Sequence, residues 1–302
     1  MTRIDYVSGT YYPYERAGVH VEDRGFQFSD GVYEVCEVRA GQLIDERRHI
    51  DRLHRSMNEL RMQPPVSRRA LGVIMRETVR RNRVHNGLVY LQITRGAAKR
   101  DFAFPPADIA ATIVCYARSK SPAAAERRAA RGIRVVTMPD IRWRRPDIKT
   151  VSLLPNALAR QAAQDAGAEE AWLVDDDGFV TEGASSNAWI LTENDELVTR
   201  PATARILRGI TRTVAIALAK REGLRIVERP FTLKEAKGAR EAFLTAAATL
   251  VMPVVQIDDR VIGNGRPGSV ATELRRIYHS QAEWSESPRS GRGPRENNSA
   301  HP

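Results

Sequence analysis

Strand-like and helix-like segments follow one another along this chain in two blocks. The first block begins with strand-like runs, and residues 32–45, "VYEVCEVRAGQLID", show the apolar alternation most clearly. Two segments with apolar residues at helical spacing follow, and then two more strand-like runs. The second block, from Ile133 onward, again mixes strands and helices. Because 302 residues suffice for two packed domains, we expect a two-domain chain of the α+β or α/β class.

The boundary between the blocks is expected near residue 120. Residues 118–132, "RSKSPAAAERRAARG", are short of apolar bulk and are typical of a linker. We predict an N-terminal domain over residues 1–118, a linker and the start of the second domain over 119–131, and a C-terminal domain over 132–280. Residues 281–302 are rich in Ser, Gly, Pro and Arg and are predicted to form a disordered tail.

The composition argues against several classes of function. No apolar run has the length of a membrane span, and the first residues lack the apolar core of a signal peptide, so we expect a cytoplasmic protein without a membrane partner. Cys36 and Cys115 lie in strand-like apolar runs, which predicts buried thiols and supports neither a disulfide nor a metal site. The net charge of +10 is spread among interleaved acids and arginines, so nucleic-acid binding is not expected.

Lysine is scarce in this chain, with only six lysines among 47 basic residues. Any lysine chemistry must therefore use one of these six. Lys149 differs from the others because the apolar run "TVSLLPNALA" follows it and can place its ammonium near a buried site. A buried lysine can lose its proton and attack a carbonyl to form a Schiff base. A half-buried lysine can equally be structural, pairing with an acid or a backbone carbonyl.

A single acid stands in a run of small polar residues at 180–187, "VTEGASSN". Glu182 is followed there by a glycine and by hydroxyl and amide side chains without bulk. The run fits a plain turn between strands. It also fits a cradle for an anionic cofactor, with the acid directed at a positively charged group.

Three motifs in order carry a resemblance to a known family. "DIKTVSLLPNALARQAA" (147–163), "VTEGASSNAWIL" (180–191) and "ILRGITR" (206–212), with "HIDRL" (49–53) upstream, closely resemble the D-amino acid aminotransferases, which are fold-type IV enzymes that use pyridoxal 5'-phosphate (PLP). The resemblance covers nearly the whole chain. It implies two domains with PLP between them and a ping-pong transfer of the amino group of a D-amino acid, such as D-alanine, to 2-oxoglutarate, pyruvate or another 2-oxo acid.

The resemblance also implies roles for single residues. Lys149 would form the Schiff base with PLP and then carry the proton of the substrate α-carbon. Glu182 would pair with the pyridine nitrogen, so that the ring can accept electrons, and Arg52 would hold the phosphate. The full cofactor-binding set is Arg52, Lys149, Glu182, Ser185, Ser186, Asn187, Leu207, Gly209, Ile210, Thr211, Ala246 and Ala247, with no metal.

For the substrate, the resemblance implies that Tyr33 and Arg100 hold the α-carboxylate, with the arginine arriving from the neighbouring subunit of a homodimer with shared active sites. The chain departs from the family pattern at two places. Phe102 stands where many relatives have a histidine, and Ala246–Ala248 stand where relatives usually carry a hydroxyl near the phosphate.

Because of Phe102, an R-selective amine transaminase remains an alternative function. Other fold-type IV activities, those of a branched-chain aminotransferase or an aminodeoxychorismate lyase, also stay open. A non-catalytic descendant that binds a phosphate ligand or nucleic acid is a third class, although Lys149 and Glu182 together argue against it.

Overall fold

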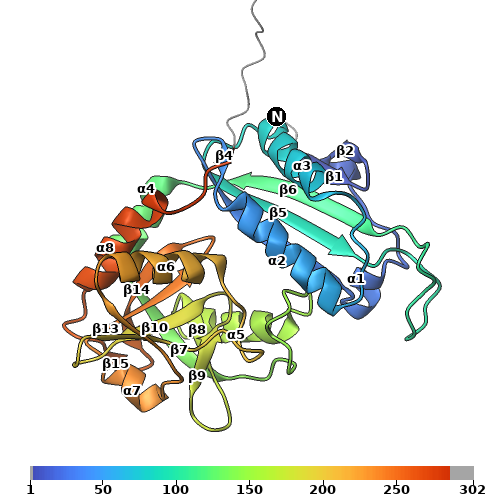
Figure 1. Cartoon of the computed structure of the whole chain (residues 1–302). Helices are drawn as coiled ribbons and strands as arrows, with labels where there is room; N and C mark the ends of the chain where they lie inside the picture. Colours follow the sequence, from blue (N-terminus) through green and yellow to red (C-terminus); the bar gives the residue numbers. More distant parts are fainter. Residues whose placement is uncertain (1–2, 286–302) are drawn as a thin grey trace, which may run out of the picture.

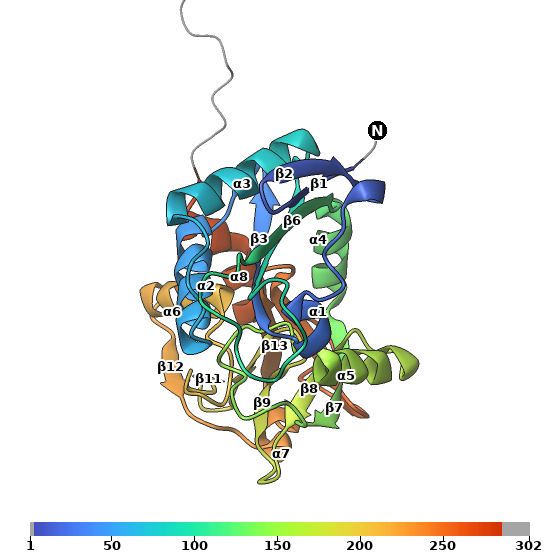
Figure 2. The same ribbon diagram turned by 90° about the vertical axis from the view of Figure 1, so that its right-hand side faces the viewer.

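The structure is a computed structural model that describes residues 3–285. These residues form two units, each built around its own sheet, and the first unit lies above the second in Figures 1 and 2. The first sheet uses strands from residues 4–119 and the second uses strands from residues 133–261. The predicted mixed fold of helices and strands is confirmed, whereas the predicted limits of the domains stay a prediction.

The first sheet is antiparallel, with the strand order β2-β1-β6-β5-β3-β4. Alternate side chains of β3 are buried, as its apolar alternation requires. The apolar stripes of α2 and α3 pack against the sheet to complete one core. The elements of this unit are β1 (Ile4–Val7), β2 (Thr10–Pro13), a short 3-10 turn (Tyr14–Arg16), α1 (Arg24–Phe28), β3 (Gly31–Arg39), β4 (Gln42–Leu43), α2 (Glu46–Glu59), α3 (Arg68–Arg81), β5 (Gly87–Thr94) and β6 (Thr112–Ser119).

The second sheet is mixed, with the order β12-β11-β10-β13-β14-β7-β8-β9 and β15 added beside β14. Its central strands are buried on both faces, because successive residues of β13 join different cores: Ala242 and Leu244 join one, and Phe243 joins the other. The strands are β7 (Ile133–Pro139), β8 (Glu170–Val174), β9 (Val180–Gly183), β10 (Asn187–Leu191), β11 (Glu196–Thr199), β12 (Arg225–Glu228), β13 (Glu241–Ala246), β14 (Leu250–Ile257) and β15 (Arg260–Val261). The helices are α5 (Leu154–Asp165), α6 (Ile210–Arg221), α7 (Leu233–Lys237) and α8 (Ser269–Ile277), which a 3-10 turn (Tyr278–Ser280) follows.

The segment between β7 and α5 joins the two units. It leaves the second sheet and runs along β3 of the first, where the N–H of Tyr33 donates to the carbonyl of Lys149 (3.0 Å) and the N–H of Val151 donates to the carbonyl of Gly31 (3.1 Å). Val32 and Thr150 form an isolated bridge in the same stretch. The backbone of Lys149 is therefore held by a strand of the other unit.

The predicted linker at 119–131 contains a helix that the sequence pattern did not indicate. α4 spans Pro122–Arg131, the hydroxyl of Ser121 caps it by accepting from the N–H of Ala124 (3.3 Å), and Pro122 occupies its first turn. Alanine favours helix, and Gly132 ends it at a positive φ of 75°. The apolar side chains of this helix are small alanines, and only Ala129 is buried. No large apolar residues at helical spacing therefore mark the helix in the sequence.

The prediction of a disordered tail from residue 281 is wrong for residues 281–285. The N–H of Ser285 donates to the carbonyl of Leu43 (2.9 Å), and the N–H of Asp45 donates to the carbonyl of Glu283 (2.7 Å). Trp284 forms a bridge with Ile44. Residues 286–302 lie outside the described part of the chain. The sequence did not predict this pairing because an edge strand takes a partner through backbone groups, which need no apolar pattern.

Two further predictions concern cysteines and membranes. Cys36 and Cys115 are both buried and free, as predicted. Within residues 3–285, no helix is long and apolar enough to cross a bilayer. Over the same range, no group of three or more His, Cys, Asp or Glu side chains is placed to hold a metal ion.

The carboxylate of Asp45 holds Tyr278 and Glu283 to the start of α2. Asp45 is 1% exposed and accepts from Arg48 (2.8 Å), from the hydroxyl of Tyr278 (3.2 Å) and from the N–H of Glu283 (3.0 Å). An Asp45→Ala variant leaves buried donors without a partner, so we expect its free energy of unfolding to fall by about 2–4 kcal/mol in urea titrations. Asp51→Ala on the exposed face of α2 is the control and should change it by less than about 0.5 kcal/mol. Equal losses in the two variants would contradict this role of Asp45.

Candidate active site

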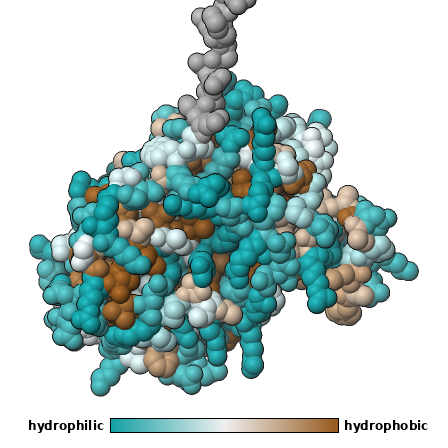
Figure 3. Space-filling model, in the orientation of Figure 1, coloured by the Kyte–Doolittle hydropathy of each residue, from teal (hydrophilic) through white to brown (hydrophobic). Residues whose placement is uncertain are grey.

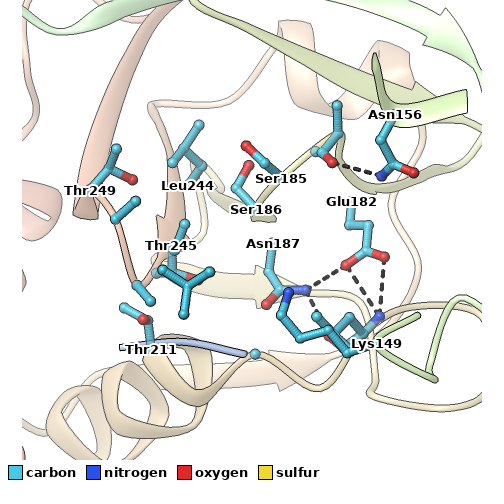
Figure 4. A pocket seen from close by; sticks show the side chains of 18 of the residues that line it. Lys149, Asn156, Glu182, Ser185, Ser186, Asn187, Thr211, Leu244, Thr245 and Thr249 are labelled. Atoms are coloured by element: carbon cyan, nitrogen blue, oxygen red, sulfur yellow. Dashed lines mark hydrogen bonds between the residues drawn. The ribbon is translucent and has the colours of Figure 1, made fainter. Parts of the chain in front are cut away.

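A pocket of about 270 Å³ lies between the two units. Its lining includes every residue predicted to bind the cofactor, together with Tyr33. Figure 4 shows several of them, among them Lys149, Glu182 and Asn187. The two other predicted substrate residues, Arg100 and Phe102, do not line it. The tertiary structure thus gathers into one place motifs that lie far apart in the chain, from Arg52 to Ala247.

Lys149 presents its amine to this pocket beside an aromatic ring. Its Nζ lies 4.1 Å from the centre of the Tyr33 ring, and the ring is stacked on Tyr90 at a centroid distance of 5.4 Å. No carboxylate among residues 3–285 forms a salt bridge with Lys149. An amine on a fixed backbone, facing a ring and without an acidic partner, is well placed to react with a carbonyl.

Glu182 is a buried carboxylate at the end of β9. It is 4% exposed and forms an ion pair with Arg142. The amide Nδ2 of Asn187 donates to it (2.8 Å; Figure 4), and so does the N–H of Leu207 (3.1 and 3.2 Å). Burial raises the pKa of Glu182, and the charge and hydrogen bonds of Arg142 oppose this rise without cancelling it. The side chain is thereby fixed in one orientation at the pocket wall.

Arg142 was not predicted from the sequence, and it is the main partner of Glu182. Its guanidinium also pairs with Asp140 (2.7 Å), which in turn accepts from the hydroxyl of Thr181 (2.7 Å). The "DIRWRRPD" run gave no periodic signal that singles out one of its arginines. Only the fold brings Arg142 to within reach of Glu182, 40 residues further along the chain.

Arg52 lies at another wall of the pocket and is tied to a buried acid. Its Nε and Nη2 donate to Glu34 (2.7 and 2.8 Å), and its Nη1 donates to the carbonyl of Arg208 (2.9 Å). His49 contacts the same carboxylate (2.7 Å). A guanidinium has more N–H groups than these three hydrogen bonds use, so Arg52 keeps donors for an anion in the pocket.

The sequence carries a signal for Glu34 that our prediction did not use. In "VYEVCEV", Glu34 stands at an alternating position that is buried together with Val32 and Cys36. An acid on the inner face of a strand requires a buried partner. Arg52 supplies it from the facing helix α2.

The start of α6 forms the part of the pocket that is best suited to an anion. Gly209 precedes the helix, and no side chain caps the first N–H groups at Ile210 and Thr211. A Cβ at Gly209 would lie 2.1 Å from Oδ1 of Asn187, so a larger residue would push against the amide that orients Glu182. Gly209 is therefore needed for close approach.

The turn between β13 and β14 faces the same region with Ala246, Ala247 and Ala248, all of which line the pocket. The next residue, Thr249, also lines it, and its hydroxyl has no hydrogen-bond partner among residues 3–285. An unpaired buried hydroxyl carries a free-energy cost of about 1–3 kcal/mol that a bound acceptor removes. The turn thus holds one unused donor beside its three alanines.

Three residues of the predicted cradle donate their side-chain hydrogen bonds to groups of the protein itself and not to a bound ligand. The hydroxyls of Ser185 and Ser186 both donate to the buried Glu170 (2.7 and 3.3 Å). Asn187 donates to Glu182 and to the carbonyl of Leu207 (2.9 Å). These side chains line the pocket, but their hydrogen bonds fix the acids and the loop around it.

The loop between β5 and β6 projects from the first sheet (Figure 1) and carries Arg100 and Phe102. The guanidinium of Arg100 lies over the rings of Phe28 (5.0 Å) and Phe102 (5.8 Å), and Phe102 is 81% exposed. In a single chain, these two side chains are therefore outside the pocket. Hydrophilic side chains cover most of the face shown in Figure 3.

Substitution of Glu34 tests the buried ion pair. Burial raises its pKa, but the charge and hydrogen bonds of Arg52, with the hydrogen bond of His49, outweigh this effect and lower the pKa from 4.5 to about 2. The ionised form therefore stabilises the fold above pH 4.5, and this contribution is lost as the pH falls towards 2. We expect Glu34→Gln to lower the free energy of unfolding by about 3 kcal/mol at pH 7.

The difference between wild type and Glu34→Gln should narrow in denaturant titrations as the pH is lowered from about 5 towards 3. Glu59→Gln is the control. Glu59 is a surface partner of Arg145 and lies on α2, the helix that carries Arg52, so its loss should lower the free energy of unfolding by less than about 0.5 kcal/mol. A difference that is independent of pH would show that Glu34 is not ionised in the native state.

Comparisons with known proteins agree on one family. Residues 31–257 match the amino-transferase class IV family. The chain is 38% identical over 257 residues to the D-alanine aminotransferase of Bacillus licheniformis, which covers 85% of this chain and 89% of that protein. It is 36% identical over 285 residues to the putative branched-chain-amino-acid aminotransferase of Methanocaldococcus jannaschii, with 92% and 96% covered.

Solved structures share the whole fold. The T.th. branched-chain amino acid aminotransferase with pyridoxamine 5'-phosphate is 26% identical and has a TM-score of 0.85, with 93% of this chain and 94% of that chain covered. The Escherichia coli branched-chain enzyme has the same TM-score of 0.85 at 23% identity, with the same shares covered. The family resemblance, the fold class and the cofactor predicted from the sequence are confirmed. The chain belongs to the class IV aminotransferases and is a PLP-dependent enzyme.

Proposed function

We propose that this aminotransferase moves the amino group of a D-amino acid, such as D-alanine, to a 2-oxo acid, with Lys149 as its catalytic residue. The observation that carries the proposal is the placement of the Lys149 amine and the buried Glu182 carboxylate in one pocket. The curated D-alanine aminotransferases that resemble the chain at 34% to 38% identity support this amino donor.

The residues of the pocket fit PLP at both of its ends. The spare N–H groups of Arg52, the uncapped start of α6 and the unpaired hydroxyl of Thr249 suit a phosphate. Thr249 would compensate for the hydroxyl that Ala246 and Ala247 lack. Glu182 suits the pyridine nitrogen, because a buried carboxylate fixed by Arg142 can hold a proton there.

Bound PLP supplies an electron sink for the pair of electrons left when the α-proton departs. Lys149 would hold the cofactor through its amine and, once a substrate amine had displaced it, its free amine would act as the base that takes the proton from the substrate α-carbon and as the acid that returns this proton to the cofactor carbon. The hydrogen bond between the backbone of Lys149 and β3 keeps the amine within reach of the pocket. Tyr33 backs the lysine and is our candidate contact for the α-carboxylate.

We also propose a homodimer in which Arg100 completes the partner's pocket. The loop that carries Arg100 does not reach the pocket of its own chain, and it exposes Phe102. A projecting loop with exposed aromatic and cationic groups suits a contact with a second copy. An amine without a carboxylate is the alternative substrate, because Phe102 makes this contact more apolar than a histidine would.

A branched-chain L-amino acid is a second candidate donor. The relative from Methanocaldococcus jannaschii and the solved structures of similar fold carry branched-chain names. The small side chains of Ala246–Ala248 leave room for a branched apolar group. The two candidates differ in the configuration of the α-carbon, which a single titration resolves.

The experiment that tests the proposal is a spectroscopic titration of the purified protein with bound PLP. Addition of D-alanine should remove the visible absorbance of the lysine-bound cofactor, and L-alanine and L-leucine should leave it unchanged. A loss of absorbance with L-leucine alone would replace the D-amino acid by the branched-chain donor. Absorbance that responds to an R-configured amine and to no amino acid would favour the amine transaminase.

Lys149→Ala should lower the rate of transamination by about 10²–10⁴-fold or more, because both the nucleophile and the proton carrier are lost. The rate is measured as oxo acid formed from D-alanine, and circular dichroism checks the fold. Lys220→Ala at the exposed end of α6 is the control and should retain the wild-type rate. A wild-type rate for Lys149→Ala would refute the assignment of this lysine.

A further inference from the structure

Arg128 is a cation on the wall of the active-site pocket that the proposed reaction does not use. It lies in the last turn of α4 and lines the same pocket as Lys149. Its side chain is half-buried, and within residues 3–285 its guanidinium forms no hydrogen bond and no ion pair. Guanidinium groups at such positions are usually paired, because their N–H groups require acceptors.

The acids nearest to Arg128 are already engaged. Glu169 pairs with Arg131 and accepts from the N–H of Arg134 (2.9 Å). Glu170 accepts from Ser185 (2.7 Å) and lies 3.4 Å from Arg160. Burial lowers the pKa of Arg128, and the carboxylate of Glu169 does not offset this effect. A partly desolvated cation with neighbouring arginines and occupied acids attracts an anion from the pocket.

The pocket that Lys149 and Arg128 both line has an apolar part that suits a short hydrocarbon chain. Ile133, Leu244 and Met252 line the pocket with buried apolar side chains. The turn at Ala246–Ala248 adds only methyl groups. An apolar lining in a pocket that also holds a cation matches methylene groups that end in a carboxylate.

We propose that Arg128 binds the distal carboxylate of a dicarboxylic oxo acid, such as 2-oxoglutarate, when this serves as the amino acceptor. This inference rests on the proposed function, in which the α-carboxylate is held on the side of Tyr33 and the reacting carbon faces Lys149. Arg128 then acts as a specificity residue. It distinguishes a dicarboxylic oxo acid from a monocarboxylic one of similar size.

The test compares Arg128→Met with wild type at a fixed amino donor. Methionine keeps an unbranched apolar stem and removes the charge. The KM for 2-oxoglutarate should rise by about 10- to 100-fold, as for the loss of a charge-assisted hydrogen bond. The KM for 2-oxobutyrate, a monocarboxylic acceptor, and its kcat should stay within about twofold.

A binding measurement separates the inference from catalysis. Glutarate lacks the reactive carbonyl, and its affinity for the PLP-bound enzyme can be measured by calorimetry. Arg128→Met should weaken glutarate binding by the same factor as the KM, while butyrate binding stays unchanged. Arg128→Lys, which retains a positive charge, should recover part of the affinity and shows that the site is not merely damaged.

Arg127→Met is the matched control, because Arg127 is the neighbouring residue of α4 and is exposed. Arg127→Met should leave the KM for 2-oxoglutarate and the KM for 2-oxobutyrate unchanged. Equal effects of Arg128→Met on both acceptors, no effect on either, or a wild type that does not bind glutarate would overturn the inference. Failure of the proposed function would give a different result. A wild type that uses L-amino donors would contradict the proposed D-amino donor, but its affinity for glutarate would still depend on Arg128.

Discussion

The pairing of the Lys149 segment with β3 is the contact on which the rest of the site depends. Two hydrogen bonds between backbone groups, at Tyr33 and Gly31, fix a segment of the second unit on the first sheet. They place the lysine amine over the Tyr33 ring and hold the two walls of the pocket together. Backbone hydrogen bonds suit this purpose because they do not depend on the charge state of the reacting groups.

The arginines of the pocket differ in how many of their N–H groups are already hydrogen-bonded within the protein. Arg142 is committed to Glu182 and Asp140, and it serves to fix an acid. Arg52 is partly committed to Glu34 and keeps donors for an anion. Arg128 is uncommitted within the described residues. In an arginine-rich chain, charge alone therefore does not identify a ligand site, whereas unused hydrogen-bonding capacity does.

The similarity to D-alanine and to branched-chain enzymes has a physical basis in this fold. Glu182 ends β9, Arg52 lies on α2, and the backbone of Lys149 is hydrogen-bonded to β3, so the sheets and a packed helix hold these groups in place. The groups that would select the substrate lie on the β5–β6 loop, on α4 and on the alanine turn. Loops and connecting segments tolerate change more readily than the sheets, so relatives with one cofactor site can differ in donor.

The sequence by itself determined the mixed fold and singled out Lys149 and Glu182 as candidate site residues, because apolar periodicity and local motifs depend only on neighbouring residues. It also indicated the start of α6 as an anion site. It could not show that Asn187 would orient Glu182, that Arg142 would neutralise it, or that Ser185 and Ser186 would turn to Glu170. Each of these choices depends on which groups from distant parts of the chain come into contact.

The helix at Pro122–Arg131 and the pairing of residues 281–285 with the first unit were likewise decided by tertiary structure. Neither segment has large apolar residues at regular spacing, so the structure of neither could be predicted from the sequence. α4 places Arg128 at the pocket, and Glu283 is hydrogen-bonded to Asp45 at the start of α2. Periodic patterns predict elements that bury an apolar face, whereas polar contacts between distant segments exist only once the chain has folded.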